Sequence, residues 1–204
     1  AIAAPDAFEL SIRNQEQIGA YSVTSKSNAV AAGRISFTFG LTGVACAFDT
    51  GCSASLSALH TAVRCLERGD CEVALVAGVN VMLSPNTTRY FAELRAISSQ
   101  GSCRSFDAEA DGYVRSEGCG AIVLQRADGR DSRIRAQATV VGVGVGHDGT
   151  SASLMAPNGR AQENLIRKTL QDAGMEPSEV DYLEAHGTGT ALGDPVEIGA
   201  VASV

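Results

Sequence analysis

Tryptophan is missing from the sequence, and only 5% of its 204 residues are aromatic, whereas glycine is plentiful at 22 residues. This mixture suits an α/β protein with tight strand–helix turns better than an all-β sandwich. The remainder is ordinary for a globular protein, with 45% hydrophobic and 19% charged residues. The chain is long enough to bury a substantial core.

Positive charge and long apolar runs are also scarce. The formal net charge is −7, and Lys and Arg form no patch, so nucleic-acid binding is not expected. No apolar run reaches the roughly 20 residues that a membrane span requires. The first ten residues lack the basic start of a signal peptide. These absences predict an intracellular protein, cytoplasmic or plastid, that is not secreted and has no membrane span.

The six cysteines lack the spacing of a metal site or a disulfide framework. No two of them are separated by two residues, and the three histidines lie far apart, so no metal site is predicted. The chain is large and apolar enough to fold without disulfides, which favours a reducing compartment. Because the chain does not begin with Met and ends without a terminating motif, we expect it to be a fragment.

Hydrophobic periodicity predicts a strand–helix–strand unit in the first half of the chain. Residues 44–48 are a short apolar run typical of a strand, and residues 73–81 resemble a strand covered on both faces of a parallel sheet. Between them, Asp49 or Thr50 can cap a helix that Gly69 ends. Apolar residues at three- and four-residue steps predict one buried stripe on this helix: Leu56, Leu59, Val63 and Leu66.

The middle of the chain is less regular. Residues 90–97 are predicted as a short helix, residues 100–117 as an ordered loop and residues 121–125 as a strand. The polar turn at residues 127–131 is the best internal boundary.

The elements after this boundary again alternate between strand and helix. Residues 134–145 and 180–185 are predicted strands on either side of a helix at residues 160–173, which Gly174 ends. One face of this helix is expected to carry Ala161, Leu165, Thr169 and Ala173.

Cys52 lies where a predicted strand turns into a helix. The first helical turn has free N–H groups and a partial positive charge, which stabilise a thiolate and make it more nucleophilic. Small neighbours, Gly51 and Ser53, leave room for an acyl chain. Position alone does not distinguish a nucleophile from one more buried small residue.

His186 follows a predicted buried strand and opens a turn at residues 187–190 (GTGT). Open α/β sheets place their sites at the carboxyl ends of strands, so this imidazole is a candidate for catalysis. His60 is interpreted as structural, and His147 is undecided. The GVGVG run at residues 142–146 lacks the order of a nucleotide-binding loop and is rejected as one. The other five cysteines are interpreted as core residues.

Several segments, in order along the chain, resemble the β-ketoacyl synthases. Residues 49–56 (DTGCSASL) resemble the nucleophile motif of this family, and residues 184–197 (EAHGTGTALGDPVE) resemble its first histidine motif. Further similar segments are residues 31–36 (AAGRIS), 105–107 (SFD), 110–115 (ADGYVR), 117–118 (EG) and 156–159 (APNG). The likeness is greatest to ketosynthase domains of modular polyketide synthases and animal-type fatty acid synthases.

The resemblance implies a thiolase-like fold of five layers, αβαβα. Residues 1–128 would be most of its N-terminal half and residues 132–204 the start of its C-terminal half. It also implies a homodimer and an acyl carrier protein, whose phosphopantetheine delivers acyl and malonyl-type thioesters, with no cofactor bound by the domain itself. The implied activity is that of an acyltransferase, which catalyses decarboxylative Claisen condensation in polyketide or fatty acid biosynthesis.

The resemblance also assigns roles to matching residues. Cys52 would take the acyl chain as a thioester, and His186 would stabilise the enolate oxygen or assist decarboxylation through water. Two hydroxyls match positions that hydrogen-bond the pantetheine arm, and two carboxylates would support the site. These four residues are Thr188, Thr190, Asp194 and Glu197.

Some features depart from the family pattern. Gly51 replaces the usual alanine, and residues 146–149 (GHDG) replace a frequent NQDG; both are expected to have minor effects. The second histidine and a lysine of the family would lie beyond residue 204, so this fragment alone is expected to be inactive. Two alternatives stay open: a non-elongating ketosynthase that only transfers acyl groups, and a related thiolase-fold acyltransferase. A non-catalytic, ketosynthase-like partner protein is disfavoured because Cys52 is present.

Overall fold

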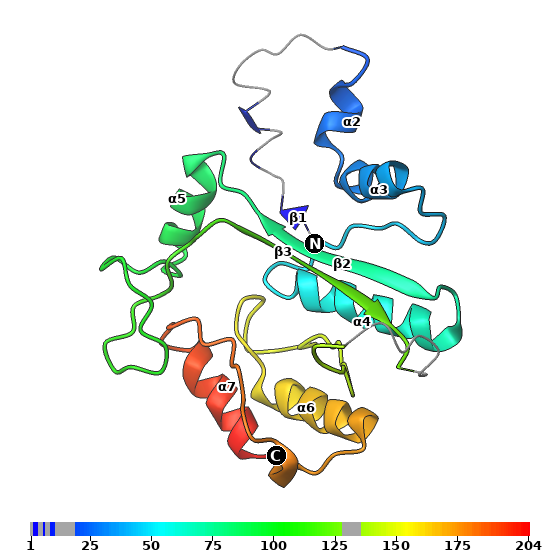
Figure 1. The fold of residues 1–204 in the computed structure, drawn as a ribbon. Coiled ribbons are helices and arrows are strands. Elements are labelled where there is room, and N and C mark those ends of the chain that lie inside the picture. The colour runs from blue at the N-terminus through cyan, green and yellow to red at the C-terminus, as the bar shows by residue number, and fades with distance from the viewer. Residues whose placement is uncertain (1, 4–5, 7–8, 11–18, 128–135) are drawn as a thin grey trace. The chain divides into compact units, whose positions relative to one another are not determined.

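A computed structural model of the chain describes residues 2–3, 6, 9–10, 19–127 and 136–204 (Figure 1). Contacts divide the chain into two compact units. The first unit comprises Ala1–Thr87 and Ser116–Arg135, and the second comprises Thr88–Arg115 and Ala136–Val204. Of the predicted boundary at residues 127–131, all but residue 127 lies outside the described residues, so the division into halves at residues 1–128 and 132–204 stays a prediction. Within the described ranges, no helix combines the length and apolarity needed to cross a bilayer.

The first unit is built on a three-stranded sheet in the order β1-β2-β3. The strands are β1 (Ile2–Ala3), β2 (Val73–Asn80) and β3 (Gly118–Gln125). β1 pairs with β2 in parallel, whereas β2 and β3 run antiparallel side by side along their whole length (Figure 1). The strands predicted at residues 73–81 and 121–125 are confirmed. The predicted parallel strand–helix–strand unit is wrong, because the long partner of β2 is the antiparallel β3.

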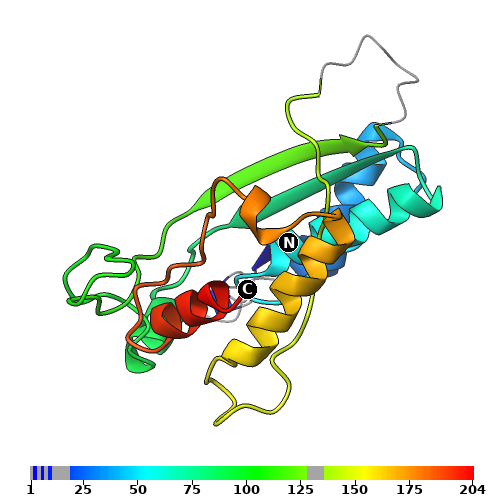
Figure 2. The same cartoon turned by 90° about the horizontal axis from the view of Figure 1, so that it is seen from below.

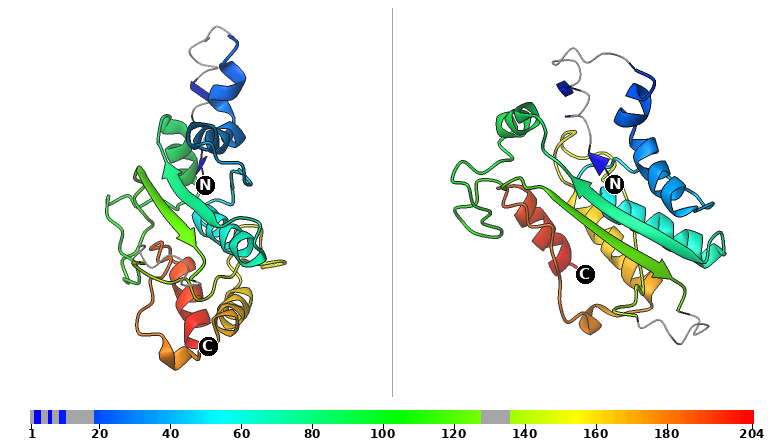
Figure 3. Two further views of the ribbon diagram at one scale, coloured as in Figure 1. Left: turned by 45° about the vertical axis from the view of Figure 1, so that its right-hand side comes forward. Right: turned by 45° about the horizontal axis from the view of Figure 1, so that its top comes forward.

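Helix α4 (Ala54–Arg68) lies on one face of this sheet (Figure 3). The contact is close at Gly78 of β2, where a Cβ atom would lie 3.2 Å from Cβ of Ser55. Leu66 is buried, but Leu56 is 61% exposed. The predicted apolar stripe therefore faces the sheet only in part.

Both ends of α4 have clear local causes. Gly69 ends the helix in the left-handed conformation with φ 77°, as predicted. The start differs from the prediction: the residue before the helix is Ser53, and neither Asp49 nor Thr50 caps it. The Ser53 hydroxyl instead donates to the carbonyl oxygen of Thr50 at 2.9 Å.

Two helices that the apolar pattern did not predict precede α4. They are α2 (Ser22–Lys26) and α3 (Asn28–Phe39), and neither contains a buried residue. Residues 44–48 are all described, yet they form no strand. That prediction is wrong because a strand requires hydrogen bonds to a neighbouring strand, and no described segment pairs with these residues.

Helix α5 (Pro85–Glu93) begins where an acidic side chain meets its N-terminus. The carboxylate of Asp6, only 4% exposed, accepts hydrogen bonds from the backbone N–H groups of Leu83 at 2.9 Å and Ser84 at 3.0 Å. A carboxylate near a helix start and a proline at its first position are both favourable. The helix predicted at residues 90–97 therefore begins earlier, and it ends before Arg95, whose φ is 53°.

The second unit contains α6 (Gly159–Ala173), η1 (Pro177–Glu179) and α7 (Gly193–Ala202). Figures 2 and 3 show α6 in yellow beside α7 in red. α6 is confirmed as predicted: the Asn158 side chain accepts a hydrogen bond from the N–H group of Ala161, and Gly174 ends the helix with φ 65°.

Two strands predicted in this unit are wrong. The strand predicted at residues 134–145 begins outside the described residues, and its described part, residues 136–145, forms no strand. Residues 180–185 form no strand either. Residues 180–185 are also not buried, since Tyr182 is 78% exposed. As at residues 44–48, an apolar run without a hydrogen-bonded neighbour does not make a strand.

Alternate glycines let the segment at residues 142–146 pack closely on α6. A Cβ atom at Gly142 would lie 2.8 Å from Cβ of Ala173 and 2.9 Å from the carbonyl oxygen of Thr169. A Cβ atom at Gly144 would clash with Oγ1 of Thr169. The GVGVG run thus has a packing role, and the predicted helix face with Thr169 and Ala173 is the face that it contacts.

We predict that Gly142→Ala lowers the free energy of unfolding by about 1–3 kcal/mol, the usual cost of overpacking. The nearby atoms include main-chain atoms of Thr169 and Ala173, which cannot rotate away. The matched control is Gly146→Ala, whose Cβ would make an ordinary contact of 3.4 Å with Leu165. Urea unfolding of the complete domain that carries this chain measures both. Equal effects of the two substitutions would contradict the packing argument.

Candidate active site

Cys52 occupies a tight turn immediately before α4, and its side chain is exposed. Gly51 has φ 63°, in the left-handed region that favours glycine, and no atom lies within 4 Å of the position of a Cβ there. The requirement for glycine is therefore conformational rather than steric. The N–H group of Ala54 donates to the carbonyl oxygen of Gly51 at 3.1 Å. This turn presents an accessible thiol at a helix N-terminus, where a thiolate is stabilised.

Side-chain hydroxyls hold the turn on the helix side. Oγ1 of Thr50 lies 2.9 Å from Oγ of Ser53 and 3.1 Å from Oγ of Ser57, and Ser57 is buried. The residues that flank the Cys52 thiol are thus fixed to the first turn of α4.

The other five cysteines do not form a core, so that prediction is wrong. Three are exposed, namely Cys46, Cys103 and Cys119, and two are half-buried, namely Cys65 and Cys71. Burial, with the nearby Cys65 and Asp70, raises the pKa of the Cys71 thiol above its ordinary value.

Two carboxylates of α7 hold the turn that contains His186. Glu197 accepts hydrogen bonds from the backbone N–H groups of His186 at 2.7 Å and Gly187 at 2.9 Å. Asp194, only 5% exposed, accepts one from the N–H group of Gly189 at 3.0 Å. Hydrogen bonds to a carboxylate are stronger than hydrogen bonds between two neutral groups. Negative charge is also favourable near a helix N-terminus. The backbone that carries His186 is consequently well fixed.

The two threonines of this turn bond to each other. Oγ1 of Thr188 lies 3.0 Å from Oγ1 of Thr190, which also accepts a hydrogen bond from the N–H group of Gly193 at 3.1 Å. Helix α7 was not predicted, because its first residues, GDP at 193–195, are typical of a turn. Proline is nevertheless tolerated in a first helical turn, where its N–H group is not needed.

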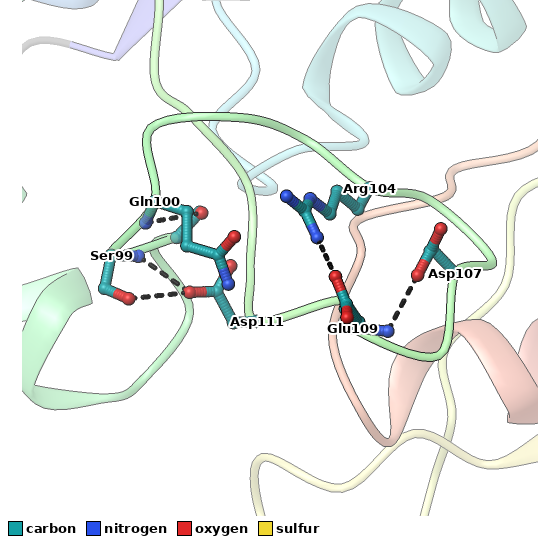
Figure 4. Close-up of polar contacts among 7 residues, drawn as sticks. Ser99, Gln100, Arg104, Asp107, Glu109 and Asp111 are labelled. Carbon is teal, nitrogen blue, oxygen red and sulfur yellow. Dashed lines mark hydrogen bonds and ion pairs between the residues drawn. The ribbon is translucent and has the colours of Figure 1, made fainter.

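A polar loop of the second unit, residues 98–112, contacts the His186 turn. Figure 4 shows its internal ion pair between Arg104 and Glu109 and the hydrogen bond from the Ser99 hydroxyl to Asp111, at 2.8 Å. Hydrogen bonds from the hydroxyls of Ser98 and Ser99 lower the pKa of Asp111 below its ordinary value. Asp111 therefore favours folding when ionised, and that contribution is lost as the pH falls through its lowered pKa.

Three hydrogen bonds join the loop to the turn and to Asp194 of α7, which holds the turn. The N–H group of Gly112 donates to the carbonyl oxygen of Gly189 at 2.8 Å, and the N–H group of Phe106 donates to Asp194 at 2.7 Å. The Ser105 hydroxyl donates to the carbonyl oxygen of Gly187. The structure thus brings His186, its two threonines and both carboxylates together in the second unit, whereas Cys52 belongs to the first unit.

Comparison with known families agrees with both halves of this description. The model of the β-ketoacyl synthase N-terminal domain matches residues 4–130, and that of the β-ketoacyl synthase C-terminal domain matches residues 137–204. The chain belongs to the β-ketoacyl synthase family. The resemblance of the sequence motifs to this family is therefore confirmed.

Curated relatives are much longer than the chain. Polyketide synthase GfsA of Streptomyces halstedii is 46% identical over 187 residues, which is 91% of this chain and 2% of that protein. Pikromycin polyketide synthase component PikAII of Streptomyces venezuelae is 46% identical over 187 residues, which is 91% of this chain and 5% of that protein.

Solved ketosynthases share the fold. The oxazolomycin ketosynthase domain OzmH KS7 of Streptomyces albus JA3453 superposes with a TM-score of 0.86 at 42% identity, covering 95% of this chain and 33% of that one. The ketosynthase from module 6 of the bacillaene synthase of Bacillus subtilis 168 has a TM-score of 0.80 at 35% identity, covering 92% and 34%. The chain thus spans about a third of these ketosynthase chains, and the expected thiolase-like fold is confirmed.

Proposed function

We propose that the chain is part of a β-ketoacyl-[acyl-carrier-protein] synthase that condenses acyl units in polyketide biosynthesis. The observation that carries this proposal is the exposed Cys52 thiol at the start of α4, within the nucleophile motif of a family whose models match residues 4–130 and 137–204. The carboxylate-held His186 turn supports it, because a fixed backbone suits an imidazole that must meet a reacting group.

The first half-reaction is acyl transfer to Cys52. The Cys52 thiolate sulfur attacks the carbonyl carbon of an acyl thioester on an acyl carrier protein, a new C–S bond forms, and the C–S bond to the carrier's phosphopantetheine breaks. The phosphopantetheine leaves as a thiolate and takes up the proton that Cys52 released when it ionised. Thr188 and Thr190 would hydrogen-bond the pantetheine arm. No cofactor is bound by the domain in this scheme.

The second half-reaction forms the carbon–carbon bond. A malonyl-type thioester on the carrier loses CO₂, and the electron pair of the broken C–C bond forms an enolate. The enolate carbon attacks the carbonyl carbon of the Cys52 thioester, whose C–S bond breaks, and Cys52 leaves as a thiolate. His186 stabilises the negative charge on the enolate oxygen, with Asp194 and Glu197 holding its turn.

An assay of the two half-reactions on the complete domain tests the proposal. With a labelled acyl thioester and a malonyl-loaded carrier protein, label appears first on the domain and then in an extended thioester, with one CO₂ released per product. Label that reaches the domain and passes to a carrier without CO₂ release assigns the non-elongating alternative. A domain that never acquires label overturns the proposal.

We also propose that the complete domain is a homodimer, supported by exposed apolar side chains at the end of α3. Phe37 is 88% exposed and Phe39 is 71% exposed, although large apolar groups are usually covered. We expect the double substitution Phe37→Asp and Phe39→Asp to convert the dimer to a monomer in analytical ultracentrifugation. The comparison variant is Leu154→Asp in the second unit, whose apolar side chain is 99% exposed; loss of the dimer in this variant alone would place the interface there instead. A monomeric parent domain, or a double variant that stays dimeric, argues against this interface.

A further inference from the structure

Phe106 has an unusual backbone conformation for a large side chain. Its φ is 64°, and within the described residues Arg95 is the other non-glycine residue with a positive φ. Residues other than glycine rarely adopt this left-handed backbone conformation, and those that are held in it are often found at functional sites. Burial does not explain the choice of phenylalanine either, because the residue is 50% exposed. Stability alone would therefore favour another residue at this position.

A buried carboxylate holds Phe106 in this conformation. One oxygen of Asp194 accepts the N–H group of Phe106 at 2.7 Å, and the other accepts the N–H group of Gly189 at 3.0 Å. Asp194 thus ties the strained residue to the turn that carries His186.

Phe106 and its neighbour press against the residue that follows His186. A Cβ atom at Gly187 would lie 3.3 Å from Cε2 and Cζ of the Phe106 ring and 3.3 Å from Cβ of Ser105. The Ser105 hydroxyl donates to the carbonyl oxygen of the same glycine. Because Glu197 binds the N–H groups of His186 and Gly187, the peptide between them is held by hydrogen bonds and by van der Waals contact.

We propose that Ser105 and Phe106 are positioning residues for the reaction: they fix the Gly187 backbone and, through it, the direction of the His186 side chain. This inference rests on the proposed role of His186. Positioning matters because a displacement of about 1 Å at a reacting group can reduce a rate by roughly 10²-fold. The strain at Phe106 is then the cost of placing its ring against the His186 turn.

The test compares the two half-reactions in the complete domain. Ser105→Ala and Phe106→Leu are each expected to slow malonyl decarboxylation by about 10-fold, as a fall in kcat with little change in KM. Loading of Cys52 is expected to stay within about twofold of the parent rate, because His186 acts in the second half-reaction. Phe106→Tyr, which keeps the ring, is expected to retain both rates.

Matched controls come from the same unit. Ser102→Ala removes an exposed hydroxyl three residues earlier in the loop, and Tyr90→Leu removes a ring that is 64% exposed on α5. Both are expected to retain the parent decarboxylation rate. Circular dichroism and urea unfolding of every variant establish that it is folded, and Ser105→Ala keeps the test decisive where Phe106→Leu does not fold.

Three results would overturn the positioning role. One is an unchanged decarboxylation rate in both Ser105→Ala and Phe106→Leu. A second is an equal loss of loading and decarboxylation, which indicates a structural defect. The third is a parent-like rate in Phe106→Asn, which tolerates the left-handed backbone but lacks the ring. Failure of the proposed function itself is distinguishable, because the parent domain would then not decarboxylate or His186→Ala would decarboxylate at the parent rate.

Discussion

Replacing Cys52 by alanine is expected to abolish acyl loading of the complete domain, with a loss of at least about 10³-fold in the loading rate. The sulfur is the atom that forms the thioester, and no neighbouring side chain can replace it in that turn, since Gly51 has none and the Ser53 hydroxyl bonds to the Thr50 carbonyl oxygen. The fold should be unaffected, because the Cys52 side chain is exposed. Intact-protein mass spectrometry after incubation with an acyl thioester measures the loading.

Cys46→Ala is the matched control for this experiment. It makes the same substitution at another exposed cysteine of the first unit, six residues earlier in the chain, and it is expected to load at the parent rate. If acylation persists in Cys52→Ala and disappears in Cys46→Ala, the nucleophile is Cys46 and the assignment to Cys52 is wrong.

His186→Ala is expected to separate the two half-reactions. Loading of Cys52 should continue, whereas decarboxylation of the malonyl thioester should fall by roughly 10²–10³-fold, the usual effect of removing a group that stabilises an oxyanion. The backbone N–H groups of residues 186 and 187 bond to Glu197 whatever the side chain, so the turn should persist. Rapid-quench measurement of released CO₂ and of protein-bound label reports the two steps in one sample.

The control for His186→Ala is His147→Ala in the same unit. The Nδ1 atom of His147 accepts the N–H group of Gly149 at 2.9 Å, which gives this imidazole a local role in its loop. Its removal is expected to leave decarboxylation near the parent rate. A greater loss in the His147 variant than in the His186 variant would contradict the assignment of the catalytic imidazole.

The sequence predicted the helices that carry their own local signals. Residues 160–173 were predicted as a helix, and α6 begins one residue earlier and ends at the same residue. α4 was likewise recognised from its apolar period and from the glycine that ends it. α7 was missed because its opening GDP is typical of a turn, and only its continuation over ten residues reveals the helix.

Strands were predicted less well, because a strand depends on a partner that local pattern does not specify. The runs at residues 44–48, 136–145 and 180–185 have the composition of strands, yet they lack a hydrogen-bonded neighbour within the described chain. The direction of strand pairing could not be predicted from local pattern either. The antiparallel pairing of β2 with β3 joins residues that are 38 to 52 positions apart, from Asn80 with Gly118 to Val73 with Gln125.

The candidate site, like the fold, could be predicted only in part from the sequence. The residues that match family motifs, Cys52 and the His186 turn, could be named from the sequence. The contacts that hold that turn could not be predicted, because the hydrogen bond from Ser105 to Gly187 joins residues 82 positions apart. The SFD motif was noticed as a family likeness, but its contact with the turn is a property of the folded second unit.

The hydrogen bonds of the His186 turn also decide which groups are left to meet the substrate. An oxyanion hole requires N–H groups directed at a substrate oxygen. The N–H groups of His186, Gly187 and Gly189 are instead directed at the carboxylates of Glu197 and Asp194. In the proposed reaction, these three N–H groups therefore supply geometry rather than an oxyanion hole, and the role of stabilising the enolate oxygen is assigned to the His186 side chain.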